Sequence, residues 1–83
     1  MSKFEMMHPQ ELKFYVNGLY AEQIAYNMRK RIFSRFNLQP DIEIGGFSDD
    51  DKRPIKVRLF ATSQLLIDIS EFIKKSFDFG ISE

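Results

Sequence analysis

The sequence predicts an α+β domain in which short strands form a sheet and two helices cover one of its faces. Three segments alternate apolar and polar residues, which is the period of a half-buried strand. Two longer segments carry apolar residues three and four positions apart, which is the period of an amphipathic helix. The chain has 83 residues, the length of one domain. We therefore expect a single domain over residues 11–83, with residues 1–10 as an N-terminal arm.

The first strand is predicted over residues 11–17, which are rich in aromatic and β-branched side chains. A helix through the same segment is the alternative, because its apolar residues also have helical spacing. That helix would place Gly18 in its interior at a cost of about 1 kcal/mol, so we favour a strand that ends at Asn17-Gly18. The alternation separates two faces, with Leu12, Phe14 and Val16 inward and Lys13 and Tyr15 outward.

The first helix is predicted over residues 19–37. The acidic Glu22 near its start and the basic Arg35 near its end suit the helix dipole. Asn37 can end the helix in a left-handed conformation. The apolar stripe of this helix consists of Ala21, Ile24, Ala25, Met28, Ile32 and Phe36.

The second and third strands are predicted over residues 41–47 and 55–61, joined as a hairpin by the loop 48–54. The hairpin register places two cations, Lys56 and Arg58, opposite two carboxylates on the outward face. Such cross-strand pairs stabilise a sheet by roughly a few tenths of a kcal/mol each. The inward residues are Ile42, Ile44, Ile55, Val57 and Leu59, and the outward residues are Asp41, Glu43, Lys56, Arg58 and Phe60.

The second helix is predicted to begin at Thr62 or Ser63, either of which can cap it. Its apolar stripe consists of Leu65, Leu66, Ile69, Phe72, Ile73 and Phe77. The tail after this helix has room for a short edge strand with Phe79 and Ile81 inward. The resulting order, β-α-β-β-α with a short final β strand as an option, predicts a ferredoxin-like plait with both helices on one face of the sheet.

The composition argues against several classes of function. Without cysteine, the chain cannot use thiol catalysis, disulfides or cysteine metal ligands. The run Asp49-Asp50-Asp51 lacks the alternation and distal glutamate of a calcium loop, and the one histidine, His8, lies in the arm. We therefore expect no enzyme, no bound metal and no cofactor. Because we find no signal peptide and no long apolar stretch, we expect a soluble cytoplasmic protein without a membrane segment.

The outward face of the predicted sheet is the candidate functional site. Its aromatic and basic residues are Lys13, Tyr15, Lys56, Arg58 and Phe60. An open sheet face with aromatic residues is typical of association surfaces. The leading hypothesis is therefore a regulatory interaction module that binds a protein partner or a second copy of the chain through this face or through the exposed edge of the second strand. Single-stranded nucleic acid is the alternative, with bases on the aromatic rings and phosphates on the cations. Asp41 and Glu43 oppose phosphate binding, and twelve basic residues balance twelve acidic ones. A solvated face without a ligand is the third interpretation.

One stretch also resembles a known family. The hexamer Phe14-Tyr15-Val16-Asn17-Gly18-Leu19 resembles the first strand of the RNA-recognition motif, with Gly18 where that family usually has asparagine. The segments 31–36 and 57–62 are similar to the end of its first helix and to its third strand running into the second helix. The resemblance implies a ferredoxin-like plait that stacks RNA bases, with Tyr15 at the first-strand stacking position. It departs on the third strand, where Lys56 and Arg58 stand in place of aromatic residues.

Overall fold

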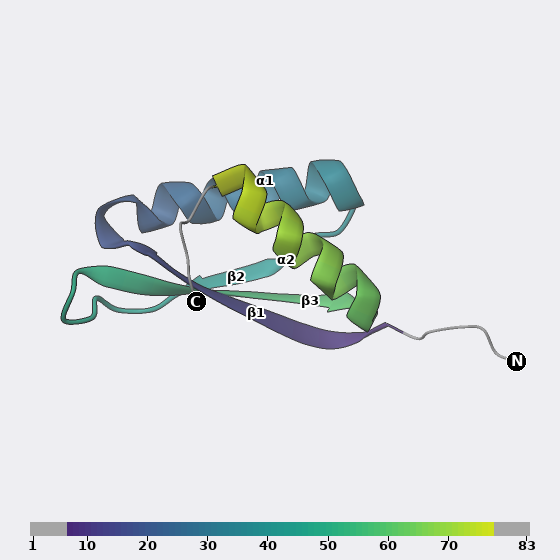
Figure 1. Cartoon of the computed structure of the whole chain (residues 1–83), viewed down its shortest axis with the longest axis horizontal. Coiled ribbons are helices and arrows are strands. Elements are labelled where there is room, and N and C mark those ends of the chain that lie inside the picture. The colour runs from purple at the N-terminus through teal and green to yellow at the C-terminus, as the bar shows by residue number, and fades with distance from the viewer. Residues whose placement is uncertain (1–6, 78–83) are drawn as a thin grey trace, which may run out of the picture.

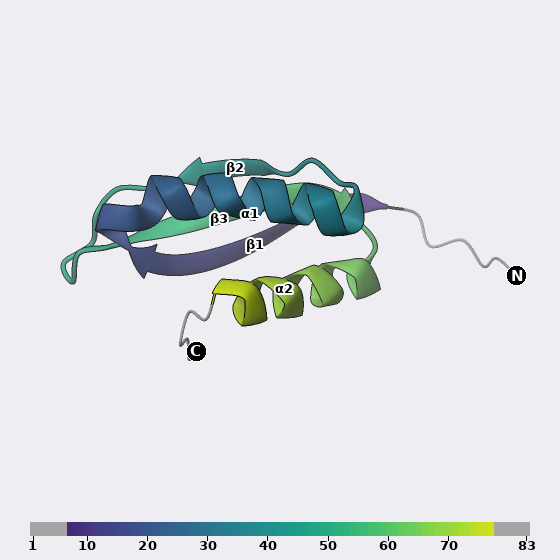
Figure 2. The same cartoon turned by 90° about the horizontal axis from the view of Figure 1, so that it is seen from above.

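The computed structural model describes residues 7–77 (Figure 1). The elements follow in the order β1 (His8–Asn17), a short 3₁₀ helix η1 (Gly18–Tyr20), α1 (Ala21–Phe36), β2 (Asp41–Ile44), β3 (Lys52–Ala61) and α2 (Ser63–Phe77). The strands form an antiparallel sheet in the order β1-β3-β2. Both helices lie on one side of this sheet, α1 over its middle and α2 on the β1 side (Figures 1 and 2). The opposite face of the sheet is therefore left without a helix.

The predicted α+β class is confirmed, but the predicted ferredoxin-like plait was wrong. That plait has two βαβ halves. Within residues 7–77 only the first half is complete, because no strand follows α2 and the sheet has three strands. Within this smaller architecture, α2 buries Ile69 and Ile73 completely, and the rest of its apolar stripe, Leu65, Leu66, Phe72 and Phe77, is partly buried against the core. The predicted final strand with Phe79 and Ile81 lies outside the described residues.

The strand β1 begins at His8, so three residues that the sequence analysis assigned to the arm belong to the sheet. The cause is β3, which is also ten residues long and pairs with β1 along its whole length. The strand β3 starts three residues earlier than predicted and includes Pro54. The Pro54 carbonyl accepts a hydrogen bond from the Gly45 amide at 2.8 Å, so the proline nitrogen also points to the side where β2 has already ended. A proline is tolerated there because no ladder hydrogen bond is lost.

The ends of the helices are fixed by side chains close to them in sequence. The Asn17 side chain accepts a hydrogen bond from the Leu19 amide at 2.9 Å and starts η1, which takes the first residues of the predicted helix. Asn37 ends α1 with φ 57° and ψ 37°, the left-handed conformation that was predicted. The Thr62 hydroxyl accepts a hydrogen bond from the Leu65 amide at 3.1 Å, which confirms Thr62 as the cap of α2.

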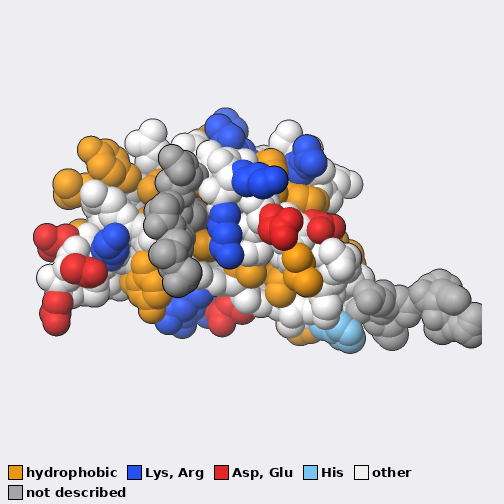
Figure 3. All heavy atoms as spheres, viewed as in Figure 1, with side chains coloured by type: hydrophobic (Ala, Val, Ile, Leu, Met, Phe, Trp, Pro, Cys, Tyr) orange, Lys and Arg blue, Asp and Glu red, His pale blue; other side chains and the backbone are white. Residues whose placement is uncertain are grey.

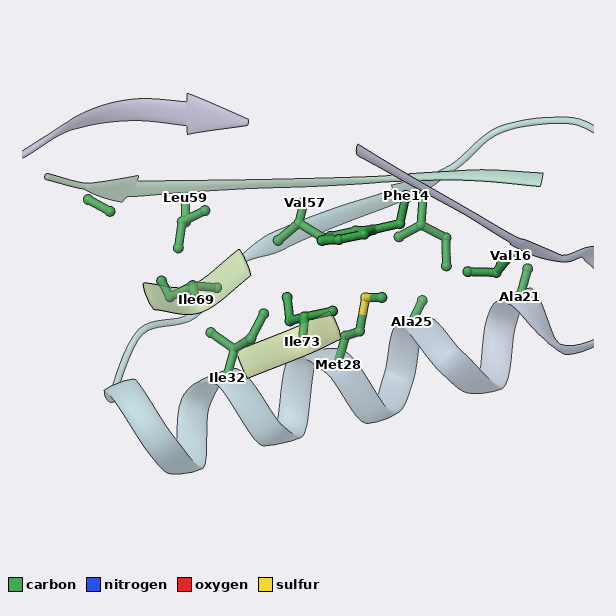
Figure 4. Packing of buried hydrophobic residues seen from close by; sticks show 12 residues of the cluster. Phe14, Val16, Ala21, Ala25, Met28, Ile32, Val57, Leu59, Ile69 and Ile73 are labelled. Atoms are coloured by element: carbon green, nitrogen blue, oxygen red, sulfur yellow. The ribbon is translucent and has the colours of Figure 1, made fainter. Parts of the chain in front are cut away.

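The hydrophobic core lies between the sheet and the two helices (Figure 4). The inward residues of β1 and β3 contact the apolar stripes of α1 and α2, as the two periodicities predicted. Full burial of each large aliphatic side chain stabilises the fold by about 1.5–3 kcal/mol. The buried residues are Phe14, Val16, Ala21, Ala25, Met28, Ile32, Ile55, Val57, Leu59, Ala61, Ile69 and Ile73.

Candidate functional site

All five predicted site residues lie on the sheet face that carries no helix, called here the open face. Successive side chains of a strand point to opposite faces, so the buried residues of β1 and β3 fix the direction of their neighbours. The strand β1 presents Lys13 and Tyr15, and β3 presents Lys56, Arg58 and Phe60. Tyr15 is 54% exposed and Phe60 is 63% exposed. The open face therefore combines two accessible aromatic rings with three cations.

Arg58 is the centre of an ion-pair network on this face. Its Nε lies 3.2 Å from a carboxylate oxygen of Glu11 on β1. Its second terminal nitrogen lies 2.9 Å from a carboxylate oxygen of Glu43 on β2. The hydrogen bond with Glu43, together with the charges of Glu43, Glu11 and Asp41, raises the pKa of the Arg58 guanidinium above its ordinary value. Carboxylates on both neighbouring strands thus neutralise this cation.

Glu11 is the residue of the candidate site that sequence reasoning missed. Alternation alone shows that Glu11 points outward, but only the register of β1 against β3 shows that it faces Arg58. The predicted register of β2 is confirmed, since Asp41 lies opposite Arg58 and Glu43 opposite Lys56. Arg58 nevertheless forms its ion pair with Glu43, its diagonal neighbour on β2, and not with Asp41 directly opposite.

Lys13 and Lys56 lie directly opposite each other on β1 and β3. Like charges in this position repel each other. Each lysine is stabilised instead by a favourable contact with another neighbour. The Lys13 ammonium lies 5.4 Å from the centre of the Tyr15 ring, within the range of a cation–π contact. Lys56 lies opposite Glu43 on its other side. The centre of the open face consequently carries positive and negative side chains side by side.

The two exposed aromatic rings do not form one platform. Tyr15 pairs with Pro54, whereas Phe60 pairs with Pro9. Pro54 and Phe60 are six residues apart on β3, which corresponds to about 20 Å along the strand. Tyr15 and Phe60 therefore stand at opposite ends of the open face.

A groove of about 520 Å³ lies at the Phe60 end of the open face. It forms because β2 starts opposite Arg58, so that β3 extends beyond its neighbour. The groove combines the apolar surfaces of Pro9 and Phe60 with polar and charged groups. Its lining residues are Pro9, Gln10, Glu11, Gln39, Asp41, Arg58, Leu59 and Phe60.

The acidic run Asp49-Asp50-Asp51 lies in the turn between β2 and β3. The Ser48 hydroxyl donates a 2.5 Å hydrogen bond to Asp50, and this bond lowers the pKa of that carboxyl group. Among residues 7–77, no three histidine or acidic side chains gather as a metal site would require. Neither helix of the same part of the chain is long and apolar enough to cross a membrane.

The resemblance to the RNA-recognition motif rests on sequence and stays a prediction. Tyr15 is exposed on the open face, but the third-strand positions beside it hold Lys56 and the neutralised Arg58. No protein-family model matches the sequence, and no curated protein or solved structure resembles it significantly.

Proposed function

We propose that this protein is a small non-catalytic interaction module that acts in the cytoplasm and binds a protein partner, or a second copy of itself, through the open face. The observation that carries this proposal is the exposed Phe60 ring at the rim of the groove. Large aromatic side chains beside a hollow are typical anchors of protein interfaces. A patch that joins Phe60 to Pro9 also has the apolar character of an interface centre.

The charges of the open face support a protein ligand over a nucleic acid. A phosphate would have to displace Glu11 or Glu43 from Arg58, and it would meet Asp41 beside them. A protein surface can instead match a patchwork of both signs with its own charges. Such complementarity fixes the orientation of the partner, while Phe60 provides apolar contact.

The layout of the groove supports the same ligand class. Pro9 and Phe60 provide an apolar wall, and Gln10, Gln39 and Asp41 provide hydrogen-bonding groups around it. Protein interfaces commonly have this arrangement of an apolar centre within a polar rim. The groove lies where β3 extends beyond the start of β2, so an extended segment or a protruding side chain of a partner can enter it.

Photo-crosslinking in cells tests the proposal, because it captures whichever protein lies against the groove. A photoreactive phenylalanine analogue replaces Phe60 in the full chain, which is then irradiated in cells that produce the protein. The matched control carries the analogue at Phe33, an exposed phenylalanine on α1. We expect a protein adduct of defined mass, or a crosslinked dimer, from position 60 only. Equal adducts from both positions, or none from position 60, would contradict the proposal.

Titration with a labelled single-stranded oligonucleotide separates the alternative. Wild-type protein should bind it weakly because Arg58 is already paired. Salt-sensitive binding that both Tyr15→Ala and Arg58→Ala weaken would replace the proposed function with nucleic-acid binding.

A further inference from the structure

The end of the molecule opposite the groove carries a second exposed apolar surface. It is formed by η1 and the loop between β2 and β3, and we name it the loop-end patch: Leu19, Tyr20 and Phe47. Leu19 is 81% exposed and Phe47 is 60% exposed. Figure 3 shows apolar side chains gathered at this end, with acidic side chains beside them. The Phe47 ring lies against Gly18, the residue directly before Leu19 and Tyr20, so these exposed apolar residues mark a candidate binding surface.

Phe47 is held in place although its ring is exposed. A Cβ atom at Gly18 would overlap the Phe47 ring, which shows that the ring lies directly against this glycine. The Arg53 guanidinium also contacts this ring, 5.1 Å from its centre. The Arg53 Nε in turn donates a 2.6 Å hydrogen bond to the Gly45 carbonyl. The loop therefore presents Phe47 in one arrangement.

The neighbouring turn is fixed in the same way. The Gly18 amide donates a 2.9 Å hydrogen bond to the Asp51 carbonyl, which ties η1 to the loop. The Leu19 amide donates to the Asn17 side chain, also at 2.9 Å. Because these groups are ordered before any ligand arrives, a partner loses less entropy when it binds them.

The charge beside the loop-end patch indicates the chemistry of its ligand. Asp49, Asp50 and Asp51 follow Phe47 closely in the loop and are exposed. Two cations, Lys52 and Arg53, come next in the sequence. The charge of Lys52 acts on Asp50, and Arg53 is engaged with Phe47 and Gly45, so the three carboxylates outnumber the nearby cations. An apolar patch bordered by carboxylates is complementary to an apolar surface bordered by lysine or arginine.

We propose that the loop-end patch docks a protein whose apolar contact surface is bordered by basic residues. This binding site is distinct from the open-face groove. Lys52 at the loop and Phe60 at the groove are eight residues apart on β3, about 26 Å along the strand. Two separate docking surfaces allow one copy of the chain to bridge two proteins, which goes beyond the function proposed above.

Amide chemical-shift mapping with two synthetic peptides tests this proposal on the full chain. The probe is an amphipathic peptide of leucine and lysine, and its matched control contains leucine and glutamate. We expect the lysine peptide to shift amides in residues 17–20 and 45–53, with weaker binding at high salt. The glutamate peptide should shift neither segment, because its carboxylates meet the acidic loop.

Two variants show whether the binding depends on the patch. Leu19→Ser should weaken binding of the lysine peptide about tenfold, because it removes one apolar side chain from the contact. The matched control, Ile67→Ser, alters a side chain on α2 that is 51% exposed and should leave the affinity unchanged. Shifts confined to the open face around Phe60 would overturn the proposal and leave the proposed function intact. Equal binding of both peptides, or no shift in either segment, would also overturn it.

Discussion

Arg58 on β3 forms an ion pair with Glu43 on β2, with 2.9 Å between nitrogen and oxygen, across the face of the sheet that carries no helix. Glu11 holds the same guanidinium from the other neighbouring strand. This network makes the open face a surface of mixed charge with an aromatic residue at each end. It is the main reason to favour a protein ligand over a polyanion.

Removing both carboxylates should turn the open face into a nucleic-acid-binding surface. In the double variant Glu11→Gln, Glu43→Gln, Arg58 loses both ion-pair partners and Lys56 loses the carboxylate opposite it. Three cations of the open face, Lys13, Lys56 and Arg58, then outnumber the remaining carboxylate of Asp41. We expect tighter binding of a single-stranded oligonucleotide than in wild type, with a steeper dependence on salt. Fluorescence anisotropy across a salt series measures both quantities.

A matched double variant controls for net charge. Glu22→Gln, Glu71→Gln removes two exposed carboxylates from the helices and leaves the open face unaltered. It should bind the oligonucleotide as weakly as wild type. An equal gain in both double variants would mean that net charge, and not the Arg58 network, limits nucleic-acid binding.

The core should depend strongly on Ile32 and little on its neighbour Phe33. Ile32 on α1 is fully buried in the core between the helices and the sheet (Figure 4). Phe33 is 46% exposed. Ile32→Ala should lower the free energy of unfolding by about 2–5 kcal/mol, since it removes buried methyl groups and leaves a cavity. Phe33→Ala should lower it by less than about 1 kcal/mol. Urea denaturation of both variants checks this contrast, and equal losses would contradict the packing of α1.

Gly18 should resist substitution because of Phe47. The Cβ atom introduced by Gly18→Ala would overlap the Phe47 ring and lie 2.9 Å from the Asp51 carbonyl oxygen. We expect the free energy of unfolding to fall by about 1–3 kcal/mol. Adding Phe47→Ala should restore part of this loss, because it removes the ring from the overlap.

Gly46 provides the control for this position. A Cβ atom at Gly46 meets nothing within 4 Å, so Gly46→Ala should be neutral or stabilise the fold by about 0.4–1 kcal/mol. Thermal unfolding of Gly18→Ala, of Gly18→Ala with Phe47→Ala, and of Gly46→Ala compares the two glycine positions. If Phe47→Ala gives no rescue, Phe47 does not pack on Gly18.

The Ser48–Asp50 hydrogen bond should leave a pH signature. It lowers the pKa of Asp50 below the ordinary value of 3.8. A group with a lower pKa in the folded state stabilises the fold above its unfolded pKa, and this contribution is lost as the pH falls through the folded value. Carbon-detected titration should give a higher Asp50 pKa in Ser48→Ala than in wild type, because the hydrogen bond that lowers this pKa most is lost. The difference in the free energy of unfolding between the two proteins should therefore shrink as the pH falls through the pKa that Asp50 has in the folded wild-type protein. An unchanged Asp50 pKa in Ser48→Ala would exclude the hydrogen bond as the cause.

Sequence periodicity predicted the faces of the elements better than their lengths or their assembly. Inward and outward residues followed from the alternation, and Asn37 and Thr62 followed from their capping chemistry. Strand lengths did not follow from it, because His8–Gln10 do not continue the apolar alternation of residues 12–16. These three residues join the sheet through the register of β1 against β3, to which the Gln10 side chain adds a hydrogen bond to the Ala61 carbonyl. The plait was inferred from element order, which does not show whether a strand follows α2.

The same limits apply to the two binding surfaces. Alternation placed Phe60 and Arg58 on one face, but Glu11 joins them only through the register between β1 and β3. The loop-end patch was not predicted, because Leu19 lay inside a predicted helix and Phe47 inside a predicted strand. The 3₁₀ turn and the end of β2 at Ile44 expose both side chains.

The most direct test of the account is the affinity of Phe60→Glu for the species that crosslinks from position 60. Sedimentation equilibrium of a homodimer, or calorimetry with a separate partner, compares wild type, Phe60→Glu and the matched variant Phe33→Glu. We predict that Phe60→Glu weakens binding at least about tenfold, because it places a charge in the apolar part of the groove, while Phe33→Glu leaves binding unchanged. Unaltered affinity in Phe60→Glu, or an equal loss in both variants, would contradict the assignment of the open face as the binding site.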